Sequence, residues 1–377
     1  MYRTSDLENC NFCKTILMLV IVLYHSGMFW DDVWTVTAPQ PYHLLINFNV
    51  WLSSFSIYGF TLVSGYIYCH IRYERGGYDT PRRFLNKKVR RILIPFAITS
   101  ILWAAPVDRF LLDFDNESMI LSYVLGCSPC QLWFLLMLFW VFVFAYPLSD
   151  YFMRRGLGSW PVILAIFLCG QILHANFLPY FQICAGMEFL LIFWIGFMLR
   201  RSGKTFTTRN LLIWGIAALI LNLAFLYCTK YFRGDSLSDY VIFKSLMWTS
   251  AIFGSVMSFM LLVAAGRLIH WEKCPLFLSL SRSSYSIYLI HHQIIYVLLV
   301  AFSWTLDPIL ATLCVFIITM ATSWGLSALL GMSSLGRIAT GDHVYAGKQK
   351  RRSQGTEPLS RRKYLSMKNY FLEASRR

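Results

Sequence analysis

Long apolar runs separated by short polar segments make up most of the chain. Ten of these runs approach or reach the roughly 17–25 residues that an α-helix needs to cross a bilayer. The pattern therefore predicts an all-α integral membrane protein of about ten transmembrane helices. The predicted helices lie near residues 14–31, 43–67, 89–107, 131–148, 160–177, 181–199, 210–228, 240–264, 284–303 and 307–330.

The first apolar run also has features of a secretory signal peptide, because Lys14 precedes a short apolar core. No small-residue cleavage site follows this run, and Trp30 marks the level of a membrane interface. We therefore expect the run to remain in the protein as its first transmembrane helix.

The composition fits a chain whose main solvent is lipid. Hydrophobic residues make up 57% of the 377 residues and charged residues only 14%. A soluble protein would have about a quarter of its residues charged. The 13 Trp and 21 Tyr residues suit the two membrane interfaces, where amphipathic rings are enriched.

Basic residues fall mainly on one side of the predicted helices. With the N-terminus in the cytoplasm, 30 of the 34 Lys and Arg residues lie on the cytoplasmic side. The positive-inside rule therefore predicts that both termini are cytoplasmic. The four exceptions are Arg109, Lys230, Arg233 and Lys244.

This asymmetry and a basic tail account for the net charge of +15, so we expect no nucleic-acid partner. Residues 1–331 are expected to form one transmembrane domain. Residues 332–377 are rich in Arg, Lys and Ser without a sustained apolar period, which predicts a mobile cytoplasmic tail near anionic lipid.

Two Cys-x-x-Cys pairs, Cys10/Cys13 and Cys127/Cys130, raise the possibility of a zinc site. Such a site would need both pairs on one side of the membrane, whereas the predicted topology puts them on opposite sides. We therefore expect no bound metal. The outer pair, Cys127 and Cys130, is equally compatible with a disulfide and with two free thiols.

Ionisable side chains inside the predicted helices are the candidates for chemistry, because each costs about 2.5–3.5 kcal/mol to insert into lipid. Four of them lie well inside, whereas His174 lies at a helix end and is less informative. The four are His25, Glu188, His291 and His292.

Lys14 and His25 are predicted to share one face of the first helix. Eleven residues advance a helix by about three turns and by roughly 16 Å. Lys14 is then expected at the cytoplasmic boundary and His25 in the outer half. The structural alternatives are a membrane anchor for Lys14 and an interhelical hydrogen bond for His25.

Glu188 is predicted at the same depth as His25, because each lies between one and two turns from the outer end of its helix. A carboxylate that orients an imidazole is a common general-base arrangement. We therefore expect His25 and Glu188 to be catalytic residues on facing helices. The alternative is a protonated Glu188 that is only hydrogen-bonded within the bundle.

The second helix and the loop after it combine a Ser-Gly step with a dense group of cations. Ser64-Gly65 would let another backbone or a ligand approach closely. Six Lys and Arg residues lie between Arg82 and Arg91. Anionic lipid and a phosphate-bearing cytosolic ligand would both suit this cluster, and charge alone does not decide between them.

These stretches resemble the membrane-bound acyltransferase family 3, whose members O-acylate bacterial surface polysaccharides. Four segments carry the resemblance in the family's order, and they extend over most of positions 14–300. They are Lys14-x10-His25, FTLVSGY at 60–66 with the basic run ending in RRILIPF, QLWFLLMLF at 131–139, and SRSSYSIYLIHHQII with Tyr285, Tyr288, Leu289 and His291 on the family's positions. One departure is Lys14, where the family usually has Arg, which alone offers a bidentate fork.

The resemblance implies a standalone O-acetyltransferase of the cell (inner) membrane, without a fused extracytoplasmic domain. It implies transfer of acetyl from cytosolic acetyl-CoA to a hydroxyl of a surface polysaccharide or lipid-linked sugar at the outer side. Acetyl-CoA would be a substrate, with no permanently bound cofactor, and the acceptor glycan and membrane lipid would be the other partners. Donor-binding roles are expected for Lys14, Ser64, Gly65, Arg90, Arg91 and His291.

A multi-pass transporter or flippase of glycan precursors is the alternative function. Such proteins favour paired broken helices and an internal repeat. The sequence has neither feature, so we expect an enzyme.

Overall fold

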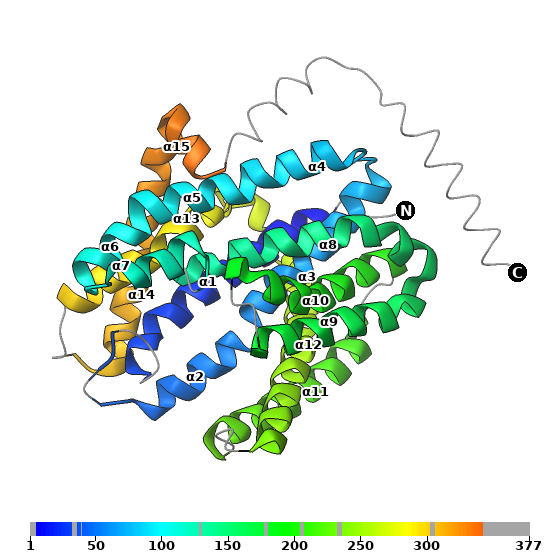
Figure 1. Cartoon of the computed structure of the whole chain (residues 1–377), viewed down its shortest axis with the longest axis horizontal. Helices are drawn as coiled ribbons and strands as arrows, with labels where there is room; N and C mark the ends of the chain where they lie inside the picture. Colours follow the sequence, from blue (N-terminus) through cyan, green and yellow to red (C-terminus); the bar gives the residue numbers. More distant parts are fainter. Residues whose placement is uncertain are drawn as a thin grey trace, which may run out of the picture.

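The computed structural model describes residues 5–31, 36–38, 40–127, 130–176, 180–203, 207–231, 236–301 and 306–341. Helices are the only regular elements within these ranges (Figure 1). The first group is α1 (Ser5–Gly27), α2 (His43–Ser53), α3 (Ser56–Cys69), α4 (Pro81–Lys88), α5 (Ile94–Thr99), α6 (Ala105–Leu111) and α7 (Asn116–Met119). The second group is α8 (Trp133–Arg155), α9 (Trp160–Asn176), α10 (Ile183–Ser202), α11 (Thr208–Tyr231), α12 (Leu237–Leu268), α13 (Pro275–Ala301), α14 (Pro308–Met332) and α15 (Ser334–Ala339).

The prediction of an all-α membrane protein is confirmed. Nine helical stretches of the described chain are long and apolar enough to cross a membrane. One of them, Cys130–His174, has 45 residues, or about 68 Å of helix against a hydrocarbon core of about 30 Å. It contains α8 and α9, which meet at Gly156, where a φ of 56° ends the helix. Counting α8 and α9 separately gives the ten predicted segments.

The segment from α4 to α6 forms one irregular rod along the molecule (Figure 1). Wide π-helical turns, Val89–Leu93 and Ser100–Ala104, join its α-helices. Pro95 and Pro106 lie just after these turns. A proline has no N–H and its ring crowds the preceding turn, so local widening of the helix is the expected result.

The helices α3 and α10 cross at the centre of the bundle. A Cβ on Gly65 would lie 2.0 Å from the Phe193 carbonyl oxygen, and one on Gly196 would lie 1.9 Å from that of Leu62. The two glycines therefore let the backbones touch from both sides, as small residues do at membrane helix crossings.

The bundle has two chemically different ends. Arg200 lies twelve residues after Glu188 on α10, which corresponds to about 18 Å. We call the end with α4 and Arg200 the basic end, and the end with His25 and Glu188 the cavity end. Which end faces the cytoplasm stays a prediction.

The helix α15 falls in the segment that the sequence assigned to the tail, and it packs beside α5. Residues 342–377 lie outside the described residues. The mobility of that part of the tail therefore stays a prediction.

Candidate active site

A cavity of about 660 Å³ lies at the cavity end of the bundle. Its walls come from the C-terminal ends of α1 and α9, the junction of α2 and α3, and the N-terminal parts of α8, α10 and α12. The second half of α13 and the C-terminal part of α11 complete them. The titratable nitrogen- and carboxyl-bearing side chains in its lining are His25, His174, Glu188 and His292. The structure therefore brings His25 and Glu188 to one cavity, as their equal depth predicted.

His25 forms a hydrogen bond with His291 of α13, with 2.8 Å between Nδ1 of His25 and Nε2 of His291. Nδ1 of His291 lies 2.8 Å from the carbonyl oxygen of Tyr288 and 3.1 Å from that of Ile287. A carbonyl can only accept, so Nδ1 of His291 carries the hydrogen. The neutral His291 ring then accepts from Nδ1–H of His25, and the lone pair of His25 is on Nε2.

A third ring completes this cluster. His292 meets His25 edge to face at 4.9 Å between ring centroids, and it meets Tyr296 in the same way at 4.8 Å. The sequence placed His291 at the donor end, deeper than His25. In the structure it lies at the level of His25 and is fully buried, because α13 packs along α1. Its hydrogen bond fixes the orientation of the His25 ring.

Glu188 has a different partner from the one that the sequence suggested. Its Oε1 lies 3.0 Å from Nδ1 of His174, and no hydrogen bond to His25 occurs among the described residues. The cause is the connection between α9 and α10. Residues at equal distance from the turn of a helical hairpin lie at equal depth, and His174 and Glu188 are each seven residues from Phe181. This equal spacing in the sequence could have predicted the His174–Glu188 pair.

Aromatic rings form much of the remaining cavity wall. Tyr58 stacks on Phe189 with ring centroids 4.9 Å apart and planes 2° apart. Trp248 meets both rings edge to face at 5.5 Å, and Trp133 meets Phe189 at 5.8 Å. Apolar walls with a few convergent polar groups are typical of small-molecule sites.

The outer Cys-x-x-Cys pair is present as two free thiols. The Cys130 thiol donates to a carboxylate oxygen of Asp108 at 3.0 Å, and the Tyr123 hydroxyl donates to the same oxygen. Cys130 also lines the cavity. Burial, followed by the charges of Cys130 and Asp108, raises the pKa of Tyr123, which therefore stays a neutral donor.

At the basic end, Lys88 is only 8% exposed. Its Nζ lies 3.1 Å from the centroid of the Phe142 ring, a close cation–π contact. No carboxylate of the described residues forms an ion pair with Lys88. The charges of Arg91, Lys87 and Lys14 repel it instead. We call these four residues the cation cluster.

The remaining predicted donor residues divide into two groups. Arg91 belongs to the cation cluster and is half-buried, and Arg90 is exposed beside it. The Ser64 hydroxyl donates to the carbonyl of Phe60 in its own helix at 2.9 Å, and Gly65 touches the α10 backbone. The sequence predicted that Ser64-Gly65 would let either another backbone or a ligand approach closely. The structure shows the close approach of a backbone, that of α10.

A second cation at this end, Arg200, is paired. Its Nε lies 2.6 Å from Oε1 of Glu74, and its Nη2 contacts Oε2 of the same carboxylate. His70 bonds the same carboxylate at 2.8 Å, and Tyr66 accepts from Arg200 at 3.1 Å. Nothing in the sequence connects Glu74 with Arg200, because the two residues are 126 positions apart.

Comparison with known families gives one match. A family model described as an acyltransferase domain matches residues 8–328. The matched region includes the cavity, the histidine cluster and the cation cluster. No curated protein and no solved structure matches the chain.

Proposed function

The chain belongs to the acyltransferase family that this match defines, and from that premise we propose that it transfers acetyl from acetyl-CoA to a sugar hydroxyl. Family membership and the apolar helices make it a multi-pass membrane acyltransferase. The finer proposal names a surface polysaccharide or lipid-linked sugar as the acceptor and the cell (inner) membrane as the location. The observation that carries the proposal is the His25–His291 hydrogen bond at the cavity.

His25 is the proposed general base. Its Nδ1–H is held by His291, so Nε2 has the lone pair that accepts the proton of an acceptor hydroxyl. Histidine suits this role because its ordinary pKa is near neutral. The bond to His291 persists when His25 becomes an imidazolium, so the ring keeps its orientation during the reaction.

The proposed reaction is a direct transfer. As the hydroxyl oxygen bonds to the thioester carbonyl carbon, its proton moves to Nε2 of His25. Collapse of the tetrahedral intermediate breaks the carbon–sulfur bond. The departing sulfur takes the proton from His25, and the products are the sugar acetate and coenzyme A. Thiols are good leaving groups, because their pKa is near 8.5.

The cation cluster is the proposed site for the phosphates of coenzyme A. The buried Lys88 has no described counter-ion, which is costly, and an anionic ligand would offset the repulsion that Arg91, Lys87 and Lys14 exert on it. Burial raises the pKa of the neighbouring Tyr78 to about 12, so that hydroxyl stays neutral. The rise between Lys14 and His25 is roughly 16 Å, which the pantetheine arm would have to cover.

The test uses the full chain in membrane vesicles with radiolabelled acetyl-CoA and an isolated surface-glycan fraction. We expect alkali-labile acetyl on the glycan with the wild-type chain and about 10²–10⁴-fold less of it with His25→Gln. His43→Gln is the matched control, because this exposed histidine lies outside the cavity. Equal acetylation by the wild-type and His25→Gln chains at equal abundance would overturn the general-base assignment. Absence of transfer by the wild-type chain would overturn the proposed reaction.

A further inference from the structure

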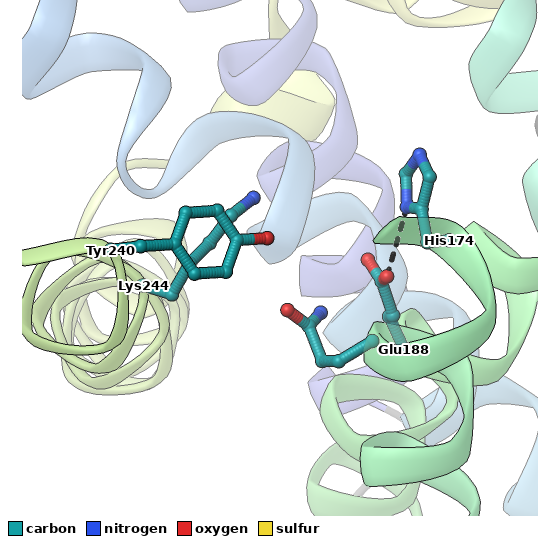
Figure 2. Close-up of a pocket in the computed structure, with 5 residues that line it drawn as sticks. His174, Glu188, Tyr240 and Lys244 are labelled. Carbon is teal, nitrogen blue, oxygen red and sulfur yellow. Dashed lines mark hydrogen bonds and ion pairs between the residues drawn. The ribbon is translucent and has the colours of Figure 1, made fainter. Parts of the chain in front are cut away.

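A second, smaller pocket of about 150 Å³ opens beside the cavity, between α12 and the α9–α10 pair. In Figure 2, Tyr240 and Lys244 face the His174–Glu188 pair across this space. Gln171 of α9 completes the lining. His174 and Glu188 line both the pocket and the main cavity, so the two spaces adjoin at this pair.

The position of Lys244 on α12 is set by the residues around it. Tyr240, Lys244 and Trp248 are spaced by four residues and share one face of the helix. Trp248 packs against Phe167 of α9 and Phe189 of α10, at 5.0 and 5.5 Å between ring centroids. These contacts turn the face toward α9 and α10. Lys244 lies one turn N-terminal to Trp248 on the same face and therefore faces the pocket.

Lys244 is half-buried in the lining of this pocket. It lies seven residues inside the 32-residue α12, about 10 Å from the helix end and therefore near the membrane boundary. A partly desolvated cation is stabilised there by a group of opposite charge. The only carboxylate in the pocket, Glu188, is bonded by His174 at 3.0 Å. No described carboxylate pairs with Lys244, whose Nζ lies 5.7 Å from the centroid of the Tyr240 ring.

We infer that this pocket is an acceptor subsite for a negatively charged substituent of the sugar, held by Lys244. The inference rests on the proposed function. An ammonium is a point charge that accepts a carboxylate or a phosphate without the fixed geometry of a guanidinium. The acceptor is therefore a sugar acid or a phosphate-linked sugar. Gln171 and Tyr240 contribute hydrogen bonds to the same ring.

The geometry links this subsite to the proposed chemistry. A sugar anchored at Lys244 extends past the His174–Glu188 pair into the cavity that His25 lines. The charged substituent then fixes the orientation of the ring, and with it the hydroxyl that reaches His25. Lys244 determines the choice of acceptor and does not touch the reacting atoms.

Binding is measured by titration calorimetry on the detergent-solubilised full chain, without acetyl-CoA. The probes are trigalacturonic acid, a neutral galactose trisaccharide and the same trisaccharide with a 1-phosphate. We expect tighter binding of a charged probe than of the neutral one, and weaker binding of that probe as salt rises. Comparison of the carboxylate and the phosphate shows which source of the charge the site takes.

Lys244→Gln should weaken binding of the preferred charged probe about tenfold and leave binding of the neutral probe unchanged, since the lost hydrogen bond is one to a charged group. Lys244→Arg should keep most of the preference. Lys230→Gln, which removes another cation of the cavity end, is the matched control and should change nothing.

Equal binding of charged and neutral probes, absence of binding by both charged probes, or an unchanged Lys244→Gln variant would overturn the subsite. These outcomes do not depend on catalysis. Failure of acetyl transfer with intact, Lys244-dependent binding would instead count against the proposed reaction alone.

Discussion

The two ends of the bundle hold their buried polar groups in different ways. At the cavity end, His25 bonds to His291 and Glu188 bonds to His174. At the basic end, Arg200 shares the Glu74 carboxylate with His70, whereas the buried Lys88 has only aromatic rings and other cations around it.

Some of these polar groups therefore have their partners within the protein, whereas others need a ligand to provide a partner. The ion pair between the buried Arg200 and the half-buried Glu74 compensates its own charge, and it connects the π-helical turn His70–Glu74, which follows α3, to α10. A buried cation without a counter-ion remains unfavourable until an anion binds. Lys88 is of this second kind, and at the opposite end the half-buried Lys244 also has no described carboxylate partner. They are therefore the places where substrate charge is expected.

The largest expected effect is on acetyl transfer, when His25 of the His25–His291 pair is replaced. His25→Gln keeps a hydrogen-bonding side chain but removes the acceptor nitrogen, so transfer should fall by about 10²–10⁴-fold. Abundance in the membrane should be unchanged. Radiolabelled acetyl transfer and immunoblotting measure the two quantities. A well-expressed variant with near wild-type transfer would assign His25 to structure.

The next effect is on stability. Arg200→Met leaves the half-buried Glu74 without its cation, and the 3–5 kcal/mol that breaking a fully buried pair costs is about the upper bound for this change. We expect a large loss of folded protein, measured by thermal unfolding in detergent. Arg201→Met is the control, because the neighbouring Arg201 is exposed and donates only to the Met153 carbonyl. Similar stability of the two variants would remove the distinction between paired and unpaired cations.

A smaller loss is expected at the crossing of α3 and α10. Gly65→Ala places a methyl group 2.0 Å from the Phe193 carbonyl oxygen, and overpacking of this kind costs typically about 1–3 kcal/mol. The KM for acetyl-CoA of the remaining folded enzyme should be unchanged. Ser64→Ala should be nearly neutral. If Gly65→Ala instead had normal stability and a raised KM for acetyl-CoA, Ser64-Gly65 would be a site of close approach for the ligand.

The sequence was sufficient to predict the helices and the level of the cavity, because both follow from one-dimensional properties. Apolar run length predicted ten segments, and helical rise put His25 and Glu188 at equal depth. Depth says nothing about which helices are neighbours. For that reason the sequence paired His25 with Glu188, whereas the packing of α13 along α1 and of α9 beside α10 gives each a different histidine.

Lys88 shows a second limit of the sequence. It is one of six cations in a run of ten residues, and nothing in the sequence distinguishes it from Arg90. The π-helical turn Val89–Leu93 changes the register of the rod after Lys88, and Lys88 is buried against Phe142 while Arg90 stays exposed. Such a change in helical register cannot be read from residue spacing.

A more modest change is expected in use of the donor. Replacing Arg90 and Arg91 with Gln removes two positive charges beside the buried Lys88, so the KM for acetyl-CoA should rise about tenfold. The kcat should change little, since neither residue is near His25. Arg154→Gln with Arg155→Gln is the control, a basic pair at the end of α8. An unaltered KM in the first double variant would identify Arg90 and Arg91 as lipid anchors.

The last prediction leaves the protein nearly unperturbed and tests which end of the bundle faces the cytoplasm. The distribution of Lys and Arg predicts that the basic end is inside. A cysteine at Asn116, at the start of α7, should react with an impermeant maleimide in intact cells. A cysteine at Arg83 in α4 should react only after permeabilisation. The native Cys274, exposed between α12 and α13, belongs to the basic end and should behave like position 83.

Reaction at position 83 in intact cells would reverse the orientation. The cation cluster would then lie on the side away from cytosolic acetyl-CoA, and its assignment to the donor would fail, whereas the His25–His291 geometry would be unaffected.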